Sequence, residues 1–106
     1  MDVSYPGGGS SVVSGLFGKY KSIRETKVRI GGSIDIRYYL LRGFDRGTGG
    51  DTYSIFVSKF KDGDTLDCEF APDISADQSE ARRIYSILCR NTVTPCALFE
   101  VLEDLL

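Results

Sequence analysis

The dipeptide Asp62-Gly63 most constrains the fold, because it lies between two stretches in which apolar and polar residues alternate. An Asp-Gly pair in this setting is typical of the two-residue turn of a β-hairpin. Such a turn pairs Val57 with Cys68. Two positions further from the turn it pairs Ile55 with Phe70. We therefore predict a hairpin in which these four side chains face the core together.

A second hairpin is predicted around the adjacent glycines 31 and 32, which precede the alternating run 33–41. A two-residue turn there sets Val28 opposite Asp35 and mixes apolar with charged positions. A three-residue loop over 31–33 instead pairs Val28 with Ile36 and Arg29 with Asp35, with a glycine at positive φ. We choose the second register, because a slip of one residue exchanges the two faces of a strand.

Together the hairpins predict a four-stranded antiparallel meander, connected by the polar, glycine-rich segment 43–51. One face is expected to carry Val28, Ile30, Ile34, Ile36, Tyr38, Leu40, Tyr53, Ile55, Val57, Leu66, Cys68 and Phe70. The opposite, mixed face carries Tyr39, Leu41, Phe56 and Phe60 among charged residues.

Two helices are predicted after the sheet. A capping-box spacing begins at Ser75, and apolar residues then recur at helical intervals. We expect this helix over 76–90, with a left-handed stop at Asn91. Thr94 and Pro95 have the residue types of a helix cap and a first helical position. Short helices need packing for stability, so both are expected to cover one face of the sheet.

The first 22 residues are expected to be flexible or loosely docked, ahead of a single α+β domain over 23–106. An additional amphipathic helix is predicted over 12–23 from its apolar spacing. Such a helix needs a docking surface, which is the mixed face of the sheet, a partner protein or a membrane interface. The start of the chain has no basic and apolar regions of a secretory signal, so we expect a cytoplasmic protein.

Several kinds of chemistry are excluded by composition. The chain has no histidine, which removes Ser-His-Asp and Cys-His catalysis. The cysteines at 68, 89 and 96 lack zinc-site spacing and are expected to be reduced and mostly buried. The carboxylates of 62–69 lack the spacing of a calcium loop. We therefore expect no enzyme, no cofactor and no metal site.

Charge is distributed unevenly along the chain. Residues 1–61 have a net charge of +5, and residues 62–106 have a net charge of −7. The basic run consists of Lys19, Lys21, Arg24, Lys27 and Arg29. It could contact nucleic-acid phosphates, or it could be a solvated strand edge that Lys and Arg protect from aggregation. For the run we favour the second interpretation, and for the uneven charge as a whole we expect the two halves simply to complement each other after folding.

Five short pieces of the sequence suggest a family. They are Tyr38-Tyr39-Leu40-Leu41, Tyr53-Ser54-Ile55, Asp73-Ile74-Ser75, Asn91-Thr92-Val93-Thr94-Pro95 and Val101-Leu102-Glu103-Asp104. Over residues 37–106 the chain resembles a family of short uncharacterised proteins of clostridia-type bacteria. The resemblance implies a bacterial cytoplasmic setting and a domain of unknown function.

The leading functional hypothesis is a non-enzymatic protein–protein interaction module that self-associates, with a homo-oligomer or another protein as partner and no membrane. It rests on surplus apolar residues, for which we expect the surface Tyr39, Leu41, Phe56, Phe60, Phe99 and Leu106. One alternative is a nucleic-acid-binding regulator that uses the basic run 19–29. The other is a small-ligand pocket between helices and sheet, lined by Asp73, Tyr85 and Cys96.

Overall fold

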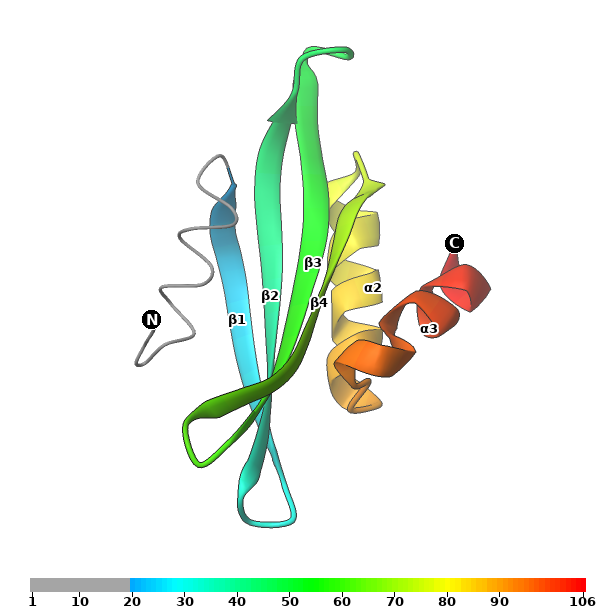
Figure 1. The fold of residues 1–106 in the computed structure, drawn as a ribbon. Helices are drawn as coiled ribbons and strands as arrows, with labels where there is room; N and C mark the ends of the chain where they lie inside the picture. Colours follow the sequence, from blue (N-terminus) through cyan, green and yellow to red (C-terminus); the bar gives the residue numbers. More distant parts are fainter. Residues whose placement is uncertain (1–19) are drawn as a thin grey trace.

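The structure, a computed structural model, describes residues 20–106. The strands are β1 (Lys21–Ile30), β2 (Ile34–Asp45), β3 (Gly50–Lys61) and β4 (Asp64–Ser75). They are followed by helix α2 (Gln78–Arg90), the short 3₁₀ helix η1 (Pro95–Ala97) and helix α3 (Leu98–Leu105). The sheet is antiparallel in the order β1-β2-β3-β4, and both helices lie on one side of it (Figure 1). The predicted α+β meander followed by two helices is therefore confirmed.

The first hairpin has the register that the sequence predicts. Val28 pairs with Ile36 and Arg29 pairs with Asp35. The three-residue loop is possible because Gly31 and Gly32 both have positive φ, at 61° and 87°. The Arg29 guanidinium donates hydrogen bonds of 2.8 and 3.2 Å to the two carboxylate oxygens of Asp35.

The main core lies between the sheet and the helices. Its buried members are Ile36, Tyr38, Leu40, Tyr53, Ile55, Val57, Ala71, Ile74, Ala81, Ile84, Tyr85, Leu88, Val93, Leu98 and Leu102. Two phenols cross this core. The Tyr85 hydroxyl of α2 donates to Thr26 Oγ1 at 2.7 Å and lies 3.1 Å from the carbonyl oxygen of Tyr38. The Tyr38 hydroxyl donates to the carbonyl oxygen of Val93 at 2.9 Å, so hydrogen bonds as well as packing hold the helical layer.

The predicted pairing of β3 with β4 is wrong beyond the turn. Thr65 pairs with Phe60, but Asp67 pairs with Lys59, which leaves Leu66 as an extra residue in a β-bulge. The bulge moves every later residue of β4 to the other face. Cys68 is therefore exposed, and Leu66 is 52% exposed.

Phe70 is moved by the same bulge. It pairs with Phe56 and packs on the face opposite the helices, whereas Ile55 pairs with Ala71 and lies in the main core. Ile30, also expected in the core, is 38% exposed at the end of β1. Val57 keeps its predicted inward position.

The corrected register gives a direct prediction for stability. Ile55→Ala should lower the free energy of unfolding by about 2–5 kcal/mol, because it leaves a cavity in the core. Cys68→Ser should change it by no more than about 0.5 kcal/mol, because the thiol is exposed. Urea unfolding followed by circular dichroism measures both free energies. A large loss of stability for Cys68→Ser would mean that Cys68 faces the core, as in the simple hairpin register.

The segment 43–51 is less of a loop than predicted. Strands β2 and β3 continue through it, with Gly43 opposite Thr52, and the turn itself is confined to residues 46–49. The Gly49 N–H donates to the carbonyl oxygen of Asp45 at 2.8 Å and closes this turn. The prediction took Gly43 as a loop residue, but Gly43 lies within β2, where its lack of a side chain leaves room for the Tyr20 ring.

The helix ends differ from prediction by one or two residues. The cap of α2 is Asp77, whose carboxylate accepts from the Ser79 N–H at 2.9 Å, rather than Ser75. The left-handed residue after α2 is Thr92, with φ of 49°, rather than Asn91. Thr94 and Pro95 do begin the next helical turn, which is η1.

The amino-terminal helix predicted over 12–23 is wrong at its last three residues, since β1 begins at Lys21. Its earlier part, residues 12–19, lies outside the described residues.

Candidate functional site

Strand β4 ends in a second and larger bulge, on which the candidate site is built. Ala71 pairs with Ile55 and Ser75 pairs with Tyr53, so three residues of β4 oppose one residue of β3. A proline, Pro72, fits there because an edge strand at a bulge does not need its N–H. The chain therefore leaves the regular ladder over residues 72–74 and returns to it at Ser75.

Asp73, at the centre of this bulge, adopts a left-handed backbone conformation with φ of 51°. Two hydroxyl groups of β3 fix it. The Asp73 N–H donates to the buried Ser54 Oγ at 2.9 Å, and the Thr52 hydroxyl donates to Asp73 Oδ1 at 3.0 Å. A strained backbone that is held in this way is common beside binding sites, and Asp73 lies between two hollows of the surface.

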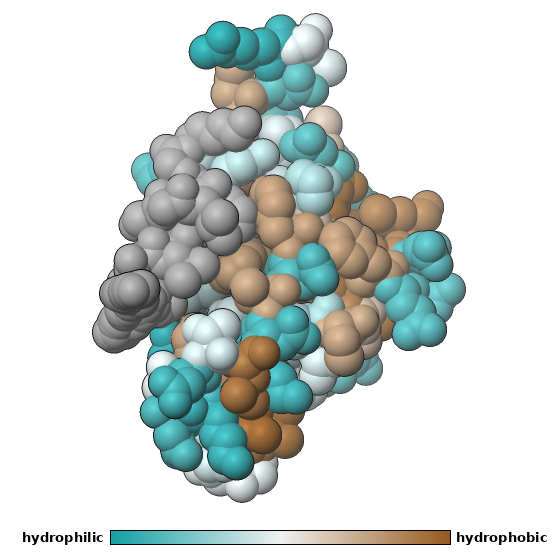
Figure 2. Space-filling model, viewed as in Figure 1, coloured by the Kyte–Doolittle hydropathy of each residue, from teal (hydrophilic) through white to brown (hydrophobic). Residues whose placement is uncertain are grey.

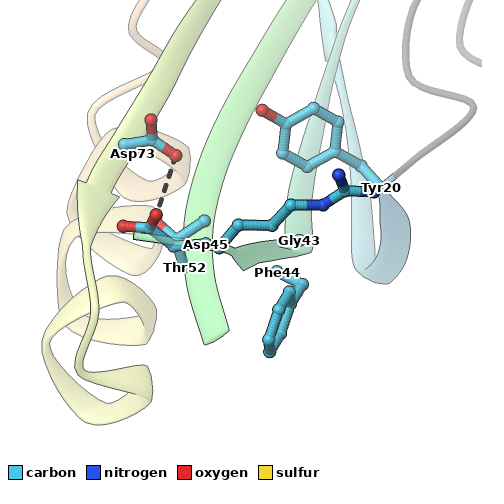
Figure 3. Close-up of a pocket in the computed structure, with 7 residues that line it drawn as sticks. Tyr20, Gly43, Phe44, Asp45, Thr52 and Asp73 are labelled. Atoms are coloured by element: carbon cyan, nitrogen blue, oxygen red, sulfur yellow. Dashed lines mark hydrogen bonds between the residues drawn. The ribbon is translucent and has the colours of Figure 1, made fainter. Parts of the chain in front are cut away.

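The first hollow has a mixed polar and apolar lining and a volume of about 320 Å³. It is lined by Tyr20, Gly43, Phe44, Asp45, Arg46, Thr52 and Asp73 (Figure 3). A side chain at Gly43 would meet the Tyr20 ring, because a Cβ there would be 2.7 Å from it. Asp45 Oδ1 accepts from the Gly47 N–H at 2.9 Å, and Asp73 accepts from Thr52. The remaining carboxylate oxygens can accept hydrogen bonds from small polar groups.

The second hollow is an apolar groove of about 340 Å³ between the end of β4 and α3. It is lined by Ala71, Pro72, Asp73, Ile74, Phe99, Leu102, Glu103 and Leu106. Two of these apolar side chains face solvent: Phe99 is 47% exposed and Leu106 is 67% exposed. The carboxylates of Asp73 and Glu103 supply its charge. Figure 2 shows apolar surface in the middle of the visible face and towards α3, between hydrophilic patches.

The predicted interaction surface is divided by the structure. Phe99 and Leu106 are exposed at the groove, whereas the four predicted residues of the mixed sheet face are buried. Those four are Tyr39, Leu41, Phe56 and Phe60. Tyr39, Leu41 and Phe56 form a second hydrophobic cluster, against which Tyr20 and Phe70 pack. The Arg37 guanidinium lies 4.5 Å from the centre of the Phe60 ring. The mixed face is thus a second small core rather than an open surface.

The groove residues of β4 were not predicted. Ala71, Pro72 and Ile74 reach the groove because of the bulge, and the simple alternation of apolar residues gave no indication of it. Pro72 was the sequence feature that could have indicated the bulge, since a proline within a strand marks an edge strand or a bulge.

The basic run 19–29 does not form one face. Lys19 lies outside the described residues, and the other four members are exposed on β1. Arg24 is paired with Leu40, so it points to the helical side, whereas Lys27 is paired with Arg37 on the opposite side. Arg29 is bonded to Asp35, and this hydrogen bond lowers the pKa of the Asp35 carboxyl.

The three residues expected to line a ligand pocket are not brought together. Asp73 lines both hollows. Tyr85 is buried in the main core, and Cys96 is exposed on η1 with its Sγ 3.4 Å from Thr94 Oγ1. Within residues 20–106 there is no group of three or more His, Cys, Asp or Glu side chains suited to a metal ion. The described helices are all too short or too polar to cross a membrane.

The fold defines a class: a small two-layer α+β protein in which a four-stranded meander is covered on one side by two helices. Comparison with protein-family models then identifies the family of the chain. A family of unknown function, DUF6514, matches residues 19–106, and the chain belongs to this family. The resemblance to a family without assigned activity is thereby confirmed. Neither the curated proteins nor the solved structures contain a match.

Proposed function

We propose that this chain is a non-enzymatic protein-interaction module that self-associates through the apolar groove between β4 and α3. The observation that supports the proposal is the exposure of Phe99 and Leu106 beside a preformed hollow. Contiguous exposed apolar surface of this kind commonly marks an interaction site. The resemblance to bacterial proteins suggests the bacterial cytoplasm as the setting.

The two edges of the sheet are poor alternatives as backbone-pairing surfaces. β1 has an irregular register around Ile23 and carries several Lys and Arg residues. β4 is interrupted by the bulge at Leu66 and by the bulge that contains Pro72. Bulges, prolines and charged side chains discourage the addition of another strand. Side-chain contacts at the groove are therefore the more favourable route for association.

Sedimentation velocity over a range of concentrations tests the proposal. The wild-type chain should associate, and Phe99→Ser or Leu106→Ser should weaken association at least about tenfold, because apolar anchors dominate such contacts. Phe44→Ser and Leu66→Ser are matched controls, since these side chains are 64% and 52% exposed away from the groove. A wild-type monomer at every concentration, or equal effects of variants and controls, would contradict the proposal.

A further inference from the structure

We infer that the groove of one copy receives the basic β1 edge of a second copy, so that the contact joins two different surfaces of the same chain. This inference rests on the proposed self-association and names the surface of the partner. The distribution of charge over the folded molecule supports it.

The β1 edge is basic. Its charged side chains are Lys21, Arg24, Glu25, Lys27 and Arg29, and all five are exposed. Four of them are positive and one is negative. The exposed Ile30 adds apolar surface at the end of the same strand.

The groove side of the molecule is acidic. Asp73 of β4 and Glu103 of α3 line the groove, and α3 adds Glu100 and Asp104 beside it. Neither element contains a Lys or an Arg. Because β1 and β4 are the two outer strands, the basic and acidic surfaces lie at opposite edges of the sheet, with α3 on the β4 side (Figure 1).

Folding brings only part of the two charged halves of the sequence together. Lys59 and Lys61 of β3 are paired with Asp67 and Asp64 of β4, but β1 lies at the far edge of the sheet. Within residues 20–106, the ion pairs that the structure shows join Arg29 to Asp35 and Arg83 to Glu80. Neither pair links the β1 edge to β4 or α3. The basic β1 edge and the acidic α3 therefore do not neutralise each other within one chain, and a second copy presents the complementary charge.

A symmetric contact of groove with groove is disfavoured by the same charges. It would bring Asp73 and Glu103 of one copy close to the same carboxylates of the other, and like charges in a contact are repulsive. A contact between basic edge and acidic groove has complementary potentials instead. Such a head-to-tail contact closes into a ring or continues as a filament.

Paired charge reversals test the inference. The basic-edge variant is Lys21→Glu with Lys27→Glu, and the acidic-groove variant is Glu103→Lys with Asp104→Lys. Each alone should associate at least about tenfold more weakly than wild type, whereas their equimolar mixture should recover association. Association of the wild type should weaken as salt is raised from 0.05 to 0.5 M, because the Debye length falls from about 14 Å to about 4 Å.

Arg82→Glu with Arg90→Glu on the exposed face of α2 is the matched control, since it reverses the same number of positive charges away from both edges. Circular dichroism verifies that each variant is folded. If the wild type associates and Phe99→Ser prevents it, but the basic-edge variant behaves as the α2 control, the inferred partner surface is wrong and self-association stands.

Two other outcomes also overturn the inference. A wild-type monomer removes self-association and the inference together. If a random single-stranded oligonucleotide binds the monomeric wild type but not the basic-edge variant, as measured by fluorescence anisotropy, the β1 edge is a nucleic-acid surface instead.

Discussion

Raising the pH above about 10 is expected to destabilise the fold steeply, through two buried phenols. Burial raises the pKa of both Tyr38 and Tyr85 well above the ordinary value of about 10, and the nearby Cys89 thiol adds to the effect. Above that pH the unfolded chain releases protons that these two phenols retain in the folded chain, and burial raises the pKa of the Tyr39 phenol in the same direction. The free energy of unfolding should then fall by about 1.4 kcal/mol per pH unit for each phenol.

The direction follows from the sign of the shift. An acid whose pKa is higher in the folded than in the unfolded state contributes its full stability below the unfolded pKa. That contribution is lost as the pH rises from about 10 towards the raised value. The pKa of Cys89 is also raised by burial, so its smaller loss begins near pH 8.5.

Tyr85→Phe isolates the contribution of one phenol. At pH 7 this variant should lose about 1–3 kcal/mol, because Thr26 Oγ1 and the carbonyl oxygen of Tyr38 lose a buried partner. Between pH 10 and 11 the difference from wild type should shrink by roughly 1.4 kcal/mol, because the variant has no phenol there to ionise. Urea unfolding at several pH values measures this. Parallel curves for the two proteins would show that Tyr85 does not titrate as proposed.

Leu98→Ala is expected to be among the most damaging single changes, whereas the same truncation one residue later is tolerated. Leu98 is fully buried beneath the start of α3, so its loss leaves a cavity that costs about 2–5 kcal/mol. Phe99 lies on the exposed flank of the same helix, and Phe99→Ala should cost about 1 kcal/mol or less.

Urea unfolding of dilute protein compares the two variants without a contribution from association. Leu98→Ala contains no altered titrating group, so its loss of stability should be the same at pH 7 and pH 10 and serves as the control for Tyr85→Phe. Equal losses for Leu98→Ala and Phe99→Ala would mean that α3 packs with a different face.

The sequence predicts correctly those parts of the fold that depend on local backbone geometry. The pairing of Val28 with Ile36 follows from the apolar pattern and from glycines that permit positive φ, and the structure has this pairing. The two helices were likewise predictable, because their apolar residues recur at helical intervals. Their ends were less so, since Ser75 and Asp77 both have cap chemistry and the fold uses Asp77.

Strand β4 shows where this reasoning stops. A regular hairpin places Cys68 inside, and the bulge at Leu66 places it outside. The apolar alternation favours the regular register, because the observed one pairs the buried Val57 with Glu69. The choice therefore depends on packing between strands rather than on the local pattern. The groove was missed for the same reason, because its floor is made by residues that the bulge displaces.

The buried character of Tyr39, Leu41, Phe56 and Phe60 was also not evident in the sequence. They alternate with inward residues, so the pattern of one half-buried sheet assigns them to solvent. A strand buried on both faces loses this alternation, and β3 is buried at every position from Thr52 to Ser58.

Because β3 contributes side chains to both hydrophobic layers, neither layer can open alone without exposing the strand that supports the other. We therefore expect local opening to be confined to the turns and to the exposed side of α3. We expect the rest of the described chain to unfold as one cooperative unit, with β3 at its centre.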